Sequence, residues 1–346
     1  MKNNLCIMLM ALLFIWSCDK QSTEPDEIKE RLNYTETNSS LPDNHVLSIL
    51  IDSNNNKWIG TANGLARLND DNWQIYNTQN SGIPSDYISA LAEDNSGNIW
   101  IGTGGYYIDL AAGLAVFDGT GWTIYNTLNS ELPVNSILCL KNDPGGAMWI
   151  GTDGGGLVKI EGSNWTIFDT NNSQLSTNRI TALDFDHDGN LWVGTISSIS
   201  LGDTTGGLGV YNGESWTVYR TDNSGLPSND VLSIHVDNSG SKWIGTLSFY
   251  GDGLAKLSNN SWETYGLSTG LYLGVVSDIC SDANGNVWFA GAYLYKYDGS
   301  QWTRFVLPSE LYSEASGFQC IACDADGSVW IGSISEGLFF EPNNGD

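Results

Sequence analysis

The sequence contains one short pattern seven times, and this repetition restricts the chain to a fold built from seven similar units. In each copy an aspartate stands six residues before a tryptophan, and glycine or asparagine stands three residues after the aspartate. Successive tryptophans lie 42 to 51 residues apart, which suits four short strands and their turns. The seven copies are Asp52–Trp58, Asp94–Trp100, Asp143–Trp149, Asp186–Trp192, Asp237–Trp243, Asp282–Trp288 and Asp324–Trp330.

The first complete unit indicates how each repeat folds. Apolar and alternating segments predict strands at 46–51, 57–61, 65–68 and 73–76, and the polar stretch after them crosses to the next unit. Glycine or asparagine between the first two strands suits a tight hairpin turn. We therefore predict an all-β protein, a seven-bladed β-propeller whose blades are four-stranded and antiparallel.

The two ends of the repeat region are expected to complete one blade together. The C-terminal unit stops within its third strand, at 337–340, and the N-terminal segment 31–34 matches an outer strand in its spacing to the following proline. An N-terminal strand in the last blade would close the ring and remove an exposed sheet edge. We expect the propeller to span 31–341 with a tail at 342–346, and we interpret the repeated tryptophans as blade core.

The first residues have the character of an export signal. An apolar run of 12 residues at 5–16 is too short to span a bilayer as a helix and suits a signal peptide. It leads directly into Ser17 and Cys18, which resembles the bacterial lipobox, so we predict a signal at 1–17, lipidation of Cys18 and an acidic tether at 18–30. An ordinary secretory signal with an incidental cysteine is the alternative. The resemblance implies a lipid anchor in the bacterial outer membrane, with the side of display left open.

The repeat resembles a known family. The recurring DNSGNIWIGT…GL…W…YNT pattern is similar to the two-component-regulator propeller repeat, and the similarity covers residues 31–341. That repeat forms the sensor part of hybrid histidine kinases in Bacteroidetes, which implies the same fold here. We expect this chain to act as a stand-alone lipoprotein without kinase domains.

The search for catalytic chemistry finds no recognisable site. The net charge of −26 opposes binding to nucleic acid. The three histidines, His45, His187 and His235, fall at different levels of the predicted blades and match no triad or metal spacing. The segment 184–189 resembles a calcium loop but lacks the bidentate glutamate. We predict a protein that is not an enzyme, with no cofactor and no metal.

Four further cysteines map to predicted inner strands. Cys139, Cys280, Cys320 and Cys323 are interpreted as small buried side chains. Cys320 and Cys323 stand three apart on one strand and face opposite sides. A bridge between Cys280 and Cys320 in neighbouring blades is the alternative left open.

Candidate binding residues lie on one face of the predicted ring. The connection between second and third strands is lengthened in three blades, at 104–112, 196–206 and 247–252, and it shares a face with the crossings between blades. Aromatic and acidic side chains in these insertions suit sugar rings, and the first residues of the inner strands add polar groups at the channel mouth. The candidates are Tyr106, Tyr107, Asp109, Phe249, Tyr250, Asp252, His45, Tyr87, Arg179 and Asp230.

We therefore expect a monomeric, non-catalytic binding module at the cell envelope, which takes a glycan or an envelope protein and touches the membrane only through its anchor. One alternative is a lyase-like enzyme that acts on a polysaccharide with His45, Tyr87 and Arg179. Another is a structural docking subunit of an envelope complex.

Overall fold

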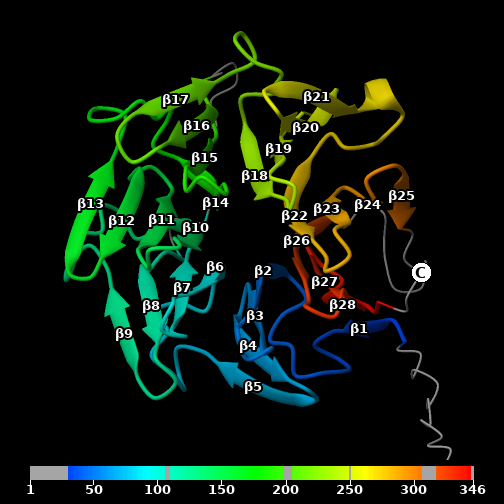
Figure 1. The fold of residues 1–346 in the computed structure, drawn as a ribbon. Coiled ribbons are helices and arrows are strands. Elements are labelled where there is room, and N and C mark those ends of the chain that lie inside the picture. The colour runs from blue at the N-terminus through cyan, green and yellow to red at the C-terminus, as the bar shows by residue number, and fades with distance from the viewer. Residues whose placement is uncertain (1–29, 106–109, 198–204, 249–250, 306–316, 344–346) are drawn as a thin grey trace, which may run out of the picture.

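The computed structural model describes residues 30–105, 110–197, 205–248, 251–305 and 317–343. These residues form seven four-stranded antiparallel sheets arranged as blades around a central axis (Figure 1). This confirms the predicted seven-bladed β-propeller. In the described part of the chain, no helix is long and apolar enough to cross a membrane.

Each blade has an inner, a second, a third and an outer strand. The inner strands are β2 (Val46–Ile51), β6 (Ile88–Glu93), β10 (Ile137–Asn142), β14 (Ile180–Phe185), β18 (Val231–Val236), β22 (Val276–Ser281) and β26 (Phe318–Cys323). The second strands are β3 (Lys57–Thr61), β7 (Ile99–Thr103), β11 (Met148–Thr152), β15 (Leu191–Thr195), β19 (Lys242–Thr246), β23 (Val287–Gly291) and β27 (Val329–Ser333). The third strands are β4 (Gly64–Asn69), β8 (Leu114–Phe117), β12 (Leu157–Glu161), β16 (Gly207–Tyr211), β20 (Asp252–Ser258), β24 (Leu294–Tyr297) and β28 (Leu338–Glu341). The outer strands are β5 (Asn72–Tyr76), β9 (Trp122–Tyr125), β13 (Asn164–Phe168), β17 (Trp216–Tyr219), β21 (Ser261–Gly266), β25 (Trp302–Phe305) and β1 (Leu32–Tyr34). A short 3-10 turn, η2 (Leu267–Thr269), follows β21.

The last blade is closed by the N-terminal strand, as the sequence predicts. β1 pairs with β28 in antiparallel register, so that Tyr34 lies opposite Leu338. The Tyr34 ring stacks on Trp330 at 6.1 Å between centroids, as Tyr76 stacks on Trp58 at 5.8 Å in blade 1. An ion pair of 2.5 Å between Arg31 and Glu341 joins the same two strands. The two ends of the propeller are therefore fastened to each other.

The repeated aspartate and tryptophan are joined by a hydrogen bond, which explains their constant spacing. In blade 1 the Asp52 carboxylate accepts hydrogen bonds from the backbone N–H groups of Asn54 and Asn56 and from Trp58 Nε1, the last at 2.8 Å. Asn55 has a φ of 63°, and the glycines at its position in the other blades have φ values of 81° to 93°. The motif thus closes the hairpin turn and fixes the core tryptophan with one side chain.

Blade 7 departs from this pattern. The Trp–Asp hydrogen bond is present in blades 1 to 6 at 2.8 to 3.0 Å. In blade 7 the Asp324 carboxylate instead forms an ion pair of 2.9 Å with Lys57 of blade 1. The buried Trp330 Nε1 has no hydrogen-bond partner in the structure. Blade 7 therefore lacks the Trp–Asp hydrogen bond of its own turn but forms an ion pair with the neighbouring blade.

In six of the seven blades a glycine stands two residues after the core tryptophan and allows neighbouring blades to approach closely, while blade 6 has Ala290 at this position. A Cβ atom on Gly60 would lie 2.9 Å from the backbone oxygen of Ile88 in the next inner strand and 2.3 Å from Ser48 Oγ. Any larger side chain would push the two blades apart. The Trp-Ile-Gly sequence therefore serves the packing of the ring.

Candidate functional site

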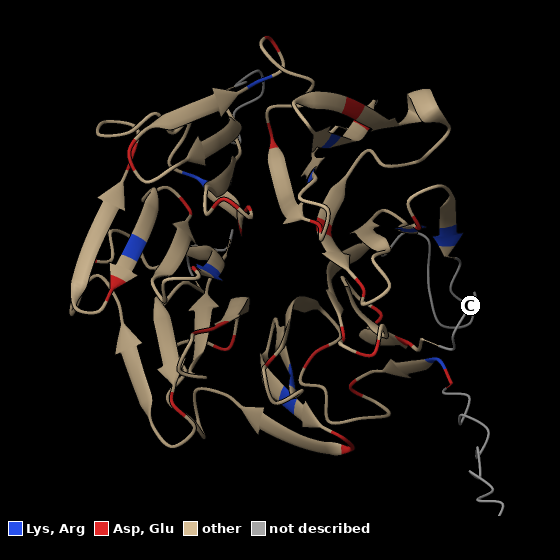
Figure 2. Cartoon of the chain, in the orientation of Figure 1, with Lys and Arg blue, Asp and Glu red and all other residues tan. Residues whose placement is uncertain are grey.

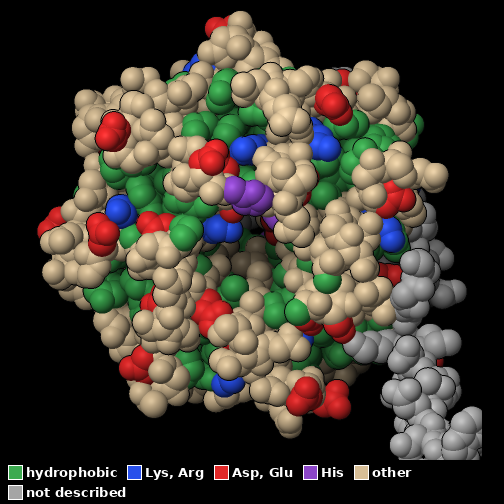
Figure 3. All heavy atoms as spheres, viewed as in Figure 1, with side chains coloured by type: hydrophobic (Ala, Val, Ile, Leu, Met, Phe, Trp, Pro, Cys, Tyr) green, Lys and Arg blue, Asp and Glu red, His purple; other side chains and the backbone are tan. Residues whose placement is uncertain are grey.

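The seven inner strands surround a central channel that contains a cavity of about 640 Å3. Figure 3 shows one face of the molecule with a hollow at its centre. The cavity reaches from His45, Tyr87 and Ile334 at one end to the middle residues of the inner strands. Its volume falls within the range of small-molecule sites.

The inner strands are joined by side-chain hydrogen bonds at every junction between blades. A hydroxyl or thiol near the start of each strand donates to the carbonyl oxygen of the first residue of the next inner strand, at 2.6 to 3.8 Å. The seven donors are Ser48, Ser89, Cys139, Thr181, Ser233, Ser277 and Cys320. Burial raises the pKa of both the Cys139 and the Cys320 thiol, so each keeps the proton it donates. The interpretation as a small buried side chain is confirmed for Cys320, whereas Cys139 is only half-buried.

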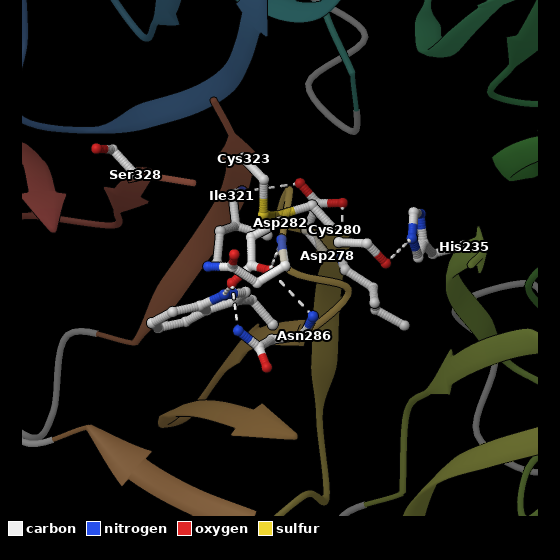
Figure 4. Close-up of a disulfide and its surroundings, with 12 residues drawn as sticks. His235, Asp278, Cys280, Asp282, Asn286, Ile321, Cys323 and Ser328 are labelled. Carbon is white, nitrogen blue, oxygen red and sulfur yellow. Dashed lines mark hydrogen bonds between the residues drawn. A yellow bond between two sulfur atoms is a disulfide. The ribbon is translucent and has the colours of Figure 1, made fainter. Parts of the chain in front are cut away.

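For the other two cysteines that interpretation is wrong. Cys280 on β22 and Cys323 on β26 form a disulfide that links the inner strands of blades 6 and 7 (Figure 4). The alternative of a Cys280–Cys320 bridge is also wrong, because Cys320 donates across the next junction to Val46. Cys323 stands three residues further along β26 and therefore faces the opposite way, towards blade 6. Neighbouring parallel inner strands bring the late positions of both strands together, which spacing along the chain does not reveal.

The connections on one side of the ring form the mouth face, which we define as the links between second and third strands together with the crossings between blades. Hydrogen bonds tie the two kinds of connection together, for example from Gly64 N to Asp86 O at 2.7 Å and from Gly113 N to Asn135 O at 3.1 Å. The other side carries the Asp–Trp hairpin turns, and we call it the turn face. The described ends of the three insertions, at 104–105 and 110–112, 196–197 and 205–206, and 247–248 and 251–252, belong to the mouth face.

Two of the predicted residues come together at the channel mouth. His45 and Tyr87 both line the cavity, and their rings meet edge to face with centroids 6.4 Å apart. Burial lowers the pKa of His45, and the negative charge of Asp43 partly opposes this. The imidazole is therefore neutral at pH 7 and can donate or accept a hydrogen bond.

Arg179, Asp230 and Asp252 are engaged in local contacts of the mouth face. Arg179 Nε donates to Asp153 at 2.6 Å, and its Nη1 donates to the carbonyl oxygen of Ser197. The Asp230 carboxylate accepts from the backbone N–H of Ser197 at 2.7 Å. Asp252 accepts two hydrogen bonds from Ser268, from its N–H and its hydroxyl. Their role in ligand binding stays a prediction.

Several predicted residues lie outside the described part of the chain. They are Tyr106, Tyr107, Asp109, Phe249, Tyr250 and the lipidation candidate Cys18.

Exposed apolar side chains gather on the mouth face. Among the described residues, six large apolar side chains are exposed, and five of them stand on mouth-face connections. These five are Leu110, Leu128, Leu267, Tyr272 and Ile334. Leu128, in the crossing from blade 2 to blade 3, is 94% exposed. The turn face contributes none of the six, so the two faces differ in the partners they can bind.

The wall of the cavity is also unevenly divided. Blades 1 to 5 contribute aliphatic side chains of their inner strands, including Leu47, Leu138, Leu140, Leu183 and Leu232, and each adds one hydroxyl or thiol. Blades 6 and 7 also contribute a hydroxyl and a thiol, but they add Asp278 and Gln319. The sequence reasoning missed this group. A comparison of equivalent inner-strand positions could have found it, because Asp278 stands where the other six blades have serine, alanine or cysteine.

Four segments of the chain match the repeat of the two component regulator propeller family. The sequence profile of that family matches residues 40–63, 82–105, 131–154 and 174–197, and each match covers a crossing, an inner strand and a second strand. A comparison with functionally curated proteins gives no significant match.

Solved structures with the same fold come from proteins of differing function. One is the extracellular domain of a protein assigned to a one-component system of B. thetaiotaomicron, with 19% identity and a TM-score of 0.65 over 86% of this chain and 40% of that one. Another is virginiamycin B lyase from Staphylococcus aureus, with 14% identity and a TM-score of 0.65 over 90% of this chain and 97% of the lyase. A third is PorZ, a surface component of the type-IX secretion system of Porphyromonas gingivalis, with 16% identity and a TM-score of 0.66 over 86% of this chain and 46% of PorZ. This chain thus spans less than half of the first and third proteins, and the similarities show the propeller fold alone.

Proposed function

We propose that this propeller is a non-catalytic binding module of the bacterial cell envelope that holds a protein partner on its mouth face. The observation that carries the proposal is that five of the six exposed large apolar side chains among the described residues stand on mouth-face connections. Four of these five, Leu110, Leu128, Leu267 and Ile334, are aliphatic. Aliphatic side chains pack well against protein, whereas sugar rings favour flat aromatic surfaces.

The disulfide supports a location outside the cytoplasm. Disulfides persist in oxidising compartments such as the periplasm and the cell surface. The Cys280–Cys323 bridge fits the export that the N-terminal signal predicts. The proposal includes anchoring in the outer membrane through Cys18. It also includes a role at the cell envelope, where proteins with a similar fold such as PorZ are found.

The arrangement at the channel mouth does not favour the lyase-like alternative. That alternative needs His45, Tyr87 and Arg179 to act on one substrate. His45 and Tyr87 line the cavity, but Arg179 lies outside its lining and binds Asp153. A guanidinium held by a carboxylate at 2.6 Å is poorly placed to stabilise a developing negative charge.

Capture from solubilised native envelopes with immobilised propeller tests the proposal. The Leu128→Glu variant places a charge in the exposed apolar group and should lose the partner, while Asn284→Glu on the turn face is the matched control and should retain it. Retention by both variants would contradict a mouth-face interface. If instead the unaltered chain binds purified polysaccharides and loses them on Tyr272→Ala, the ligand is a glycan and the protein-partner proposal is wrong.

A further inference from the structure

Asp278 is a carboxylate without a counter-ion in the wall of the channel. Its Oδ1 accepts the backbone N–H of Ile279 and its Oδ2 accepts that of Ile321, both at 2.9 Å. Figure 4 shows this carboxyl group between β22 and β26, beside the disulfide. A carboxylate has room for about four hydrogen bonds. Asp278 lines the cavity and forms no ion pair with any residue that the structure describes, so its remaining capacity faces the cavity.

The contrast with Asp184 shows that the ring can supply a counter-ion where it needs one. Asp184 likewise accepts a backbone N–H of the next blade, that of Val236, at 2.7 Å. In addition it forms an ion pair of 2.7 Å with Lys141 from the preceding blade. Asp278 has no such partner, although both carboxylates occupy inner strands.

The charge of Asp278 is kept at a free-energy cost. Burial raises the pKa of Asp278 to about 6, against the opposing effects of its two N–H donors and of the Lys141 charge. A buried carboxylate that is still ionised at pH 7 marks a candidate functional group when it also lines a cavity.

The groups beside Asp278 can share in binding. The Gln319 side chain lines the same cavity and makes no hydrogen bond to any described residue. The same cavity is lined by leucines of blades 1 to 5, whose hydroxyls Ser48, Ser89, Thr181 and Ser233 already donate to the neighbouring blade. The aromatic rings in the described lining, those of His45 and Tyr87, are confined to the mouth. The deeper cavity therefore combines one carboxylate with many aliphatic side chains, which suits an alkyl chain better than a sugar.

We propose that the channel binds a protonated primary amine carried on an aliphatic chain, with the ammonium against Asp278 and Gln319 and the chain against the leucines. This inference rests on the proposed function, in which the mouth face is the binding face, and it names the chemistry of the channel behind that face. The net charge of −26 draws cations towards the molecule, and Figure 2 shows acidic residues all around the ring. The amine can belong to a free alkylamine or to a lysine of the docked protein.

Among the titratable groups around Asp278, Asp278 itself is the one whose protonation should control binding near pH 6. Lys141 on β10 is held by Asp184. His235 on β18 contacts Ser281 at 2.6 Å, and burial lowers its pKa. Cys320 on β26 stays protonated because burial raises its pKa. His45 at the mouth also has a lowered pKa. An alkylamine should therefore bind more weakly as the pH falls from 8 to 5 and Asp278 gains a proton.

Titration calorimetry with hexylamine, hexanol and N-acetyl-lysine methylamide tests the inference. Hexylamine should bind the unaltered chain at least about tenfold more tightly than hexanol, which is about 1.4 kcal/mol. Asp278→Asn should remove this preference. The control Glu93→Gln removes one negative charge at a residue that binds Ser53 on the turn face, and it should preserve the preference.

The outcomes separate this inference from the proposed function. If N-acetyl-lysine methylamide binds as tightly as hexylamine, the natural ligand is a lysine of the docked protein. If only hexylamine binds, the natural ligand is a free alkylamine. Absence of hexylamine binding, or equal affinity for hexanol, would overturn the inference even if Asp278→Asn fails to fold. Partner capture that is sensitive to Leu128→Glu would still stand in that case.

Discussion

The turn face and the mouth face of the propeller are built on opposite principles. On the turn face each Asp–Trp hairpin of blades 1 to 6 is short and held by hydrogen bonds to its aspartate, as Asp237 holds Ser239, Ser241 and Trp243. On the mouth face the connections differ in length and carry the exposed apolar side chains, such as Leu128. This difference indicates that the turns stabilise the blades, whereas the mouth connections can vary in length and sequence and so provide a binding surface. Changes to the scaffold and the channel should therefore alter stability, and changes on the mouth face should alter binding.

The largest effect on stability should come from the disulfide, which belongs to the scaffold. Replacing Cys280 and Cys323 by serine removes a link across 43 residues of sequence and should lower the free energy of unfolding by about 4 kcal/mol. Guanidinium unfolding measures this change. Cys139→Ser, which keeps a donor to Ile180, is the control and should cost far less. A double variant as stable as the unaltered chain would show that the disulfide does not secure the ring.

Replacing Asp278 should raise the stability of the protein, whereas replacing the disulfide should lower it. Asp278 provides a charge in the channel at a cost in folding free energy. Its folded-state pKa of about 6 exceeds the unfolded value of 3.8. Its stabilising contribution is therefore complete below pH 3.8 and is lost as the pH rises through 6. Relative to the unaltered chain, Asp278→Asn should gain about 2 kcal/mol of stability between pH 4 and pH 7.

The pH series also contains an internal control. His235 has a lowered pKa through burial, so its contribution runs the other way, is present above pH 6.5 and is lost on acidification. The unaltered protein and the Asp278→Asn variant both contain His235. Its effect therefore cancels in the difference between their free energies of unfolding. A difference that does not change with pH would contradict the role given to Asp278.

A smaller effect should distinguish two tryptophans of the turn-face scaffold. Trp243 donates a hydrogen bond to Asp237 at 2.8 Å, whereas the buried Trp330 Nε1 has no hydrogen-bond partner among the described residues. Both lose similar volume on replacement by phenylalanine. Trp243→Phe should therefore cost about 1 to 3 kcal/mol more than Trp330→Phe, as measured by thermal unfolding. Equal costs would mean that the Trp–Asp bond does not stabilise the blade.

The smallest effect on stability is expected on the mouth face. Leu128→Ser should change the free energy of unfolding by less than about 0.5 kcal/mol, because the side chain is 94% exposed. A loss of more than 1 kcal/mol in the same thermal assay would show that this crossing supports the scaffold and would weaken the distinction between the faces.

The fold could be predicted from the sequence because its determinants are local and repeated. The Asp–Trp bond spans six residues, so a constant spacing exposes it. The closing strand could be named from the spacing of Tyr34 alone. The predicted strands 46–51 and 57–61 coincide with β2 and β3.

Contacts between blades could be predicted only in part. The pairing of Cys280 with Cys323 depends on the register between two inner strands that share no ladder hydrogen bonds, and no local pattern encodes it. The same holds for the ion pair of Asp324 with Lys57, which joins the last blade to the first. His45 and Tyr87 were placed correctly at the mouth because each stands directly before an inner strand. Asp278 was missed because it looks like an ordinary strand residue until seven blades are aligned around one channel.

Photo-crosslinking in intact cells tests the central claim most directly. A photoreactive residue at Leu128 or Ile334 on the mouth face is compared with one at Asn284 on the turn face. If the partner binds the mouth face, both mouth-face positions should crosslink to the same envelope protein and the turn-face position should not. Crosslinks to one protein from Asn284, with none from Leu128 and Ile334, would show that the partner binds the opposite face.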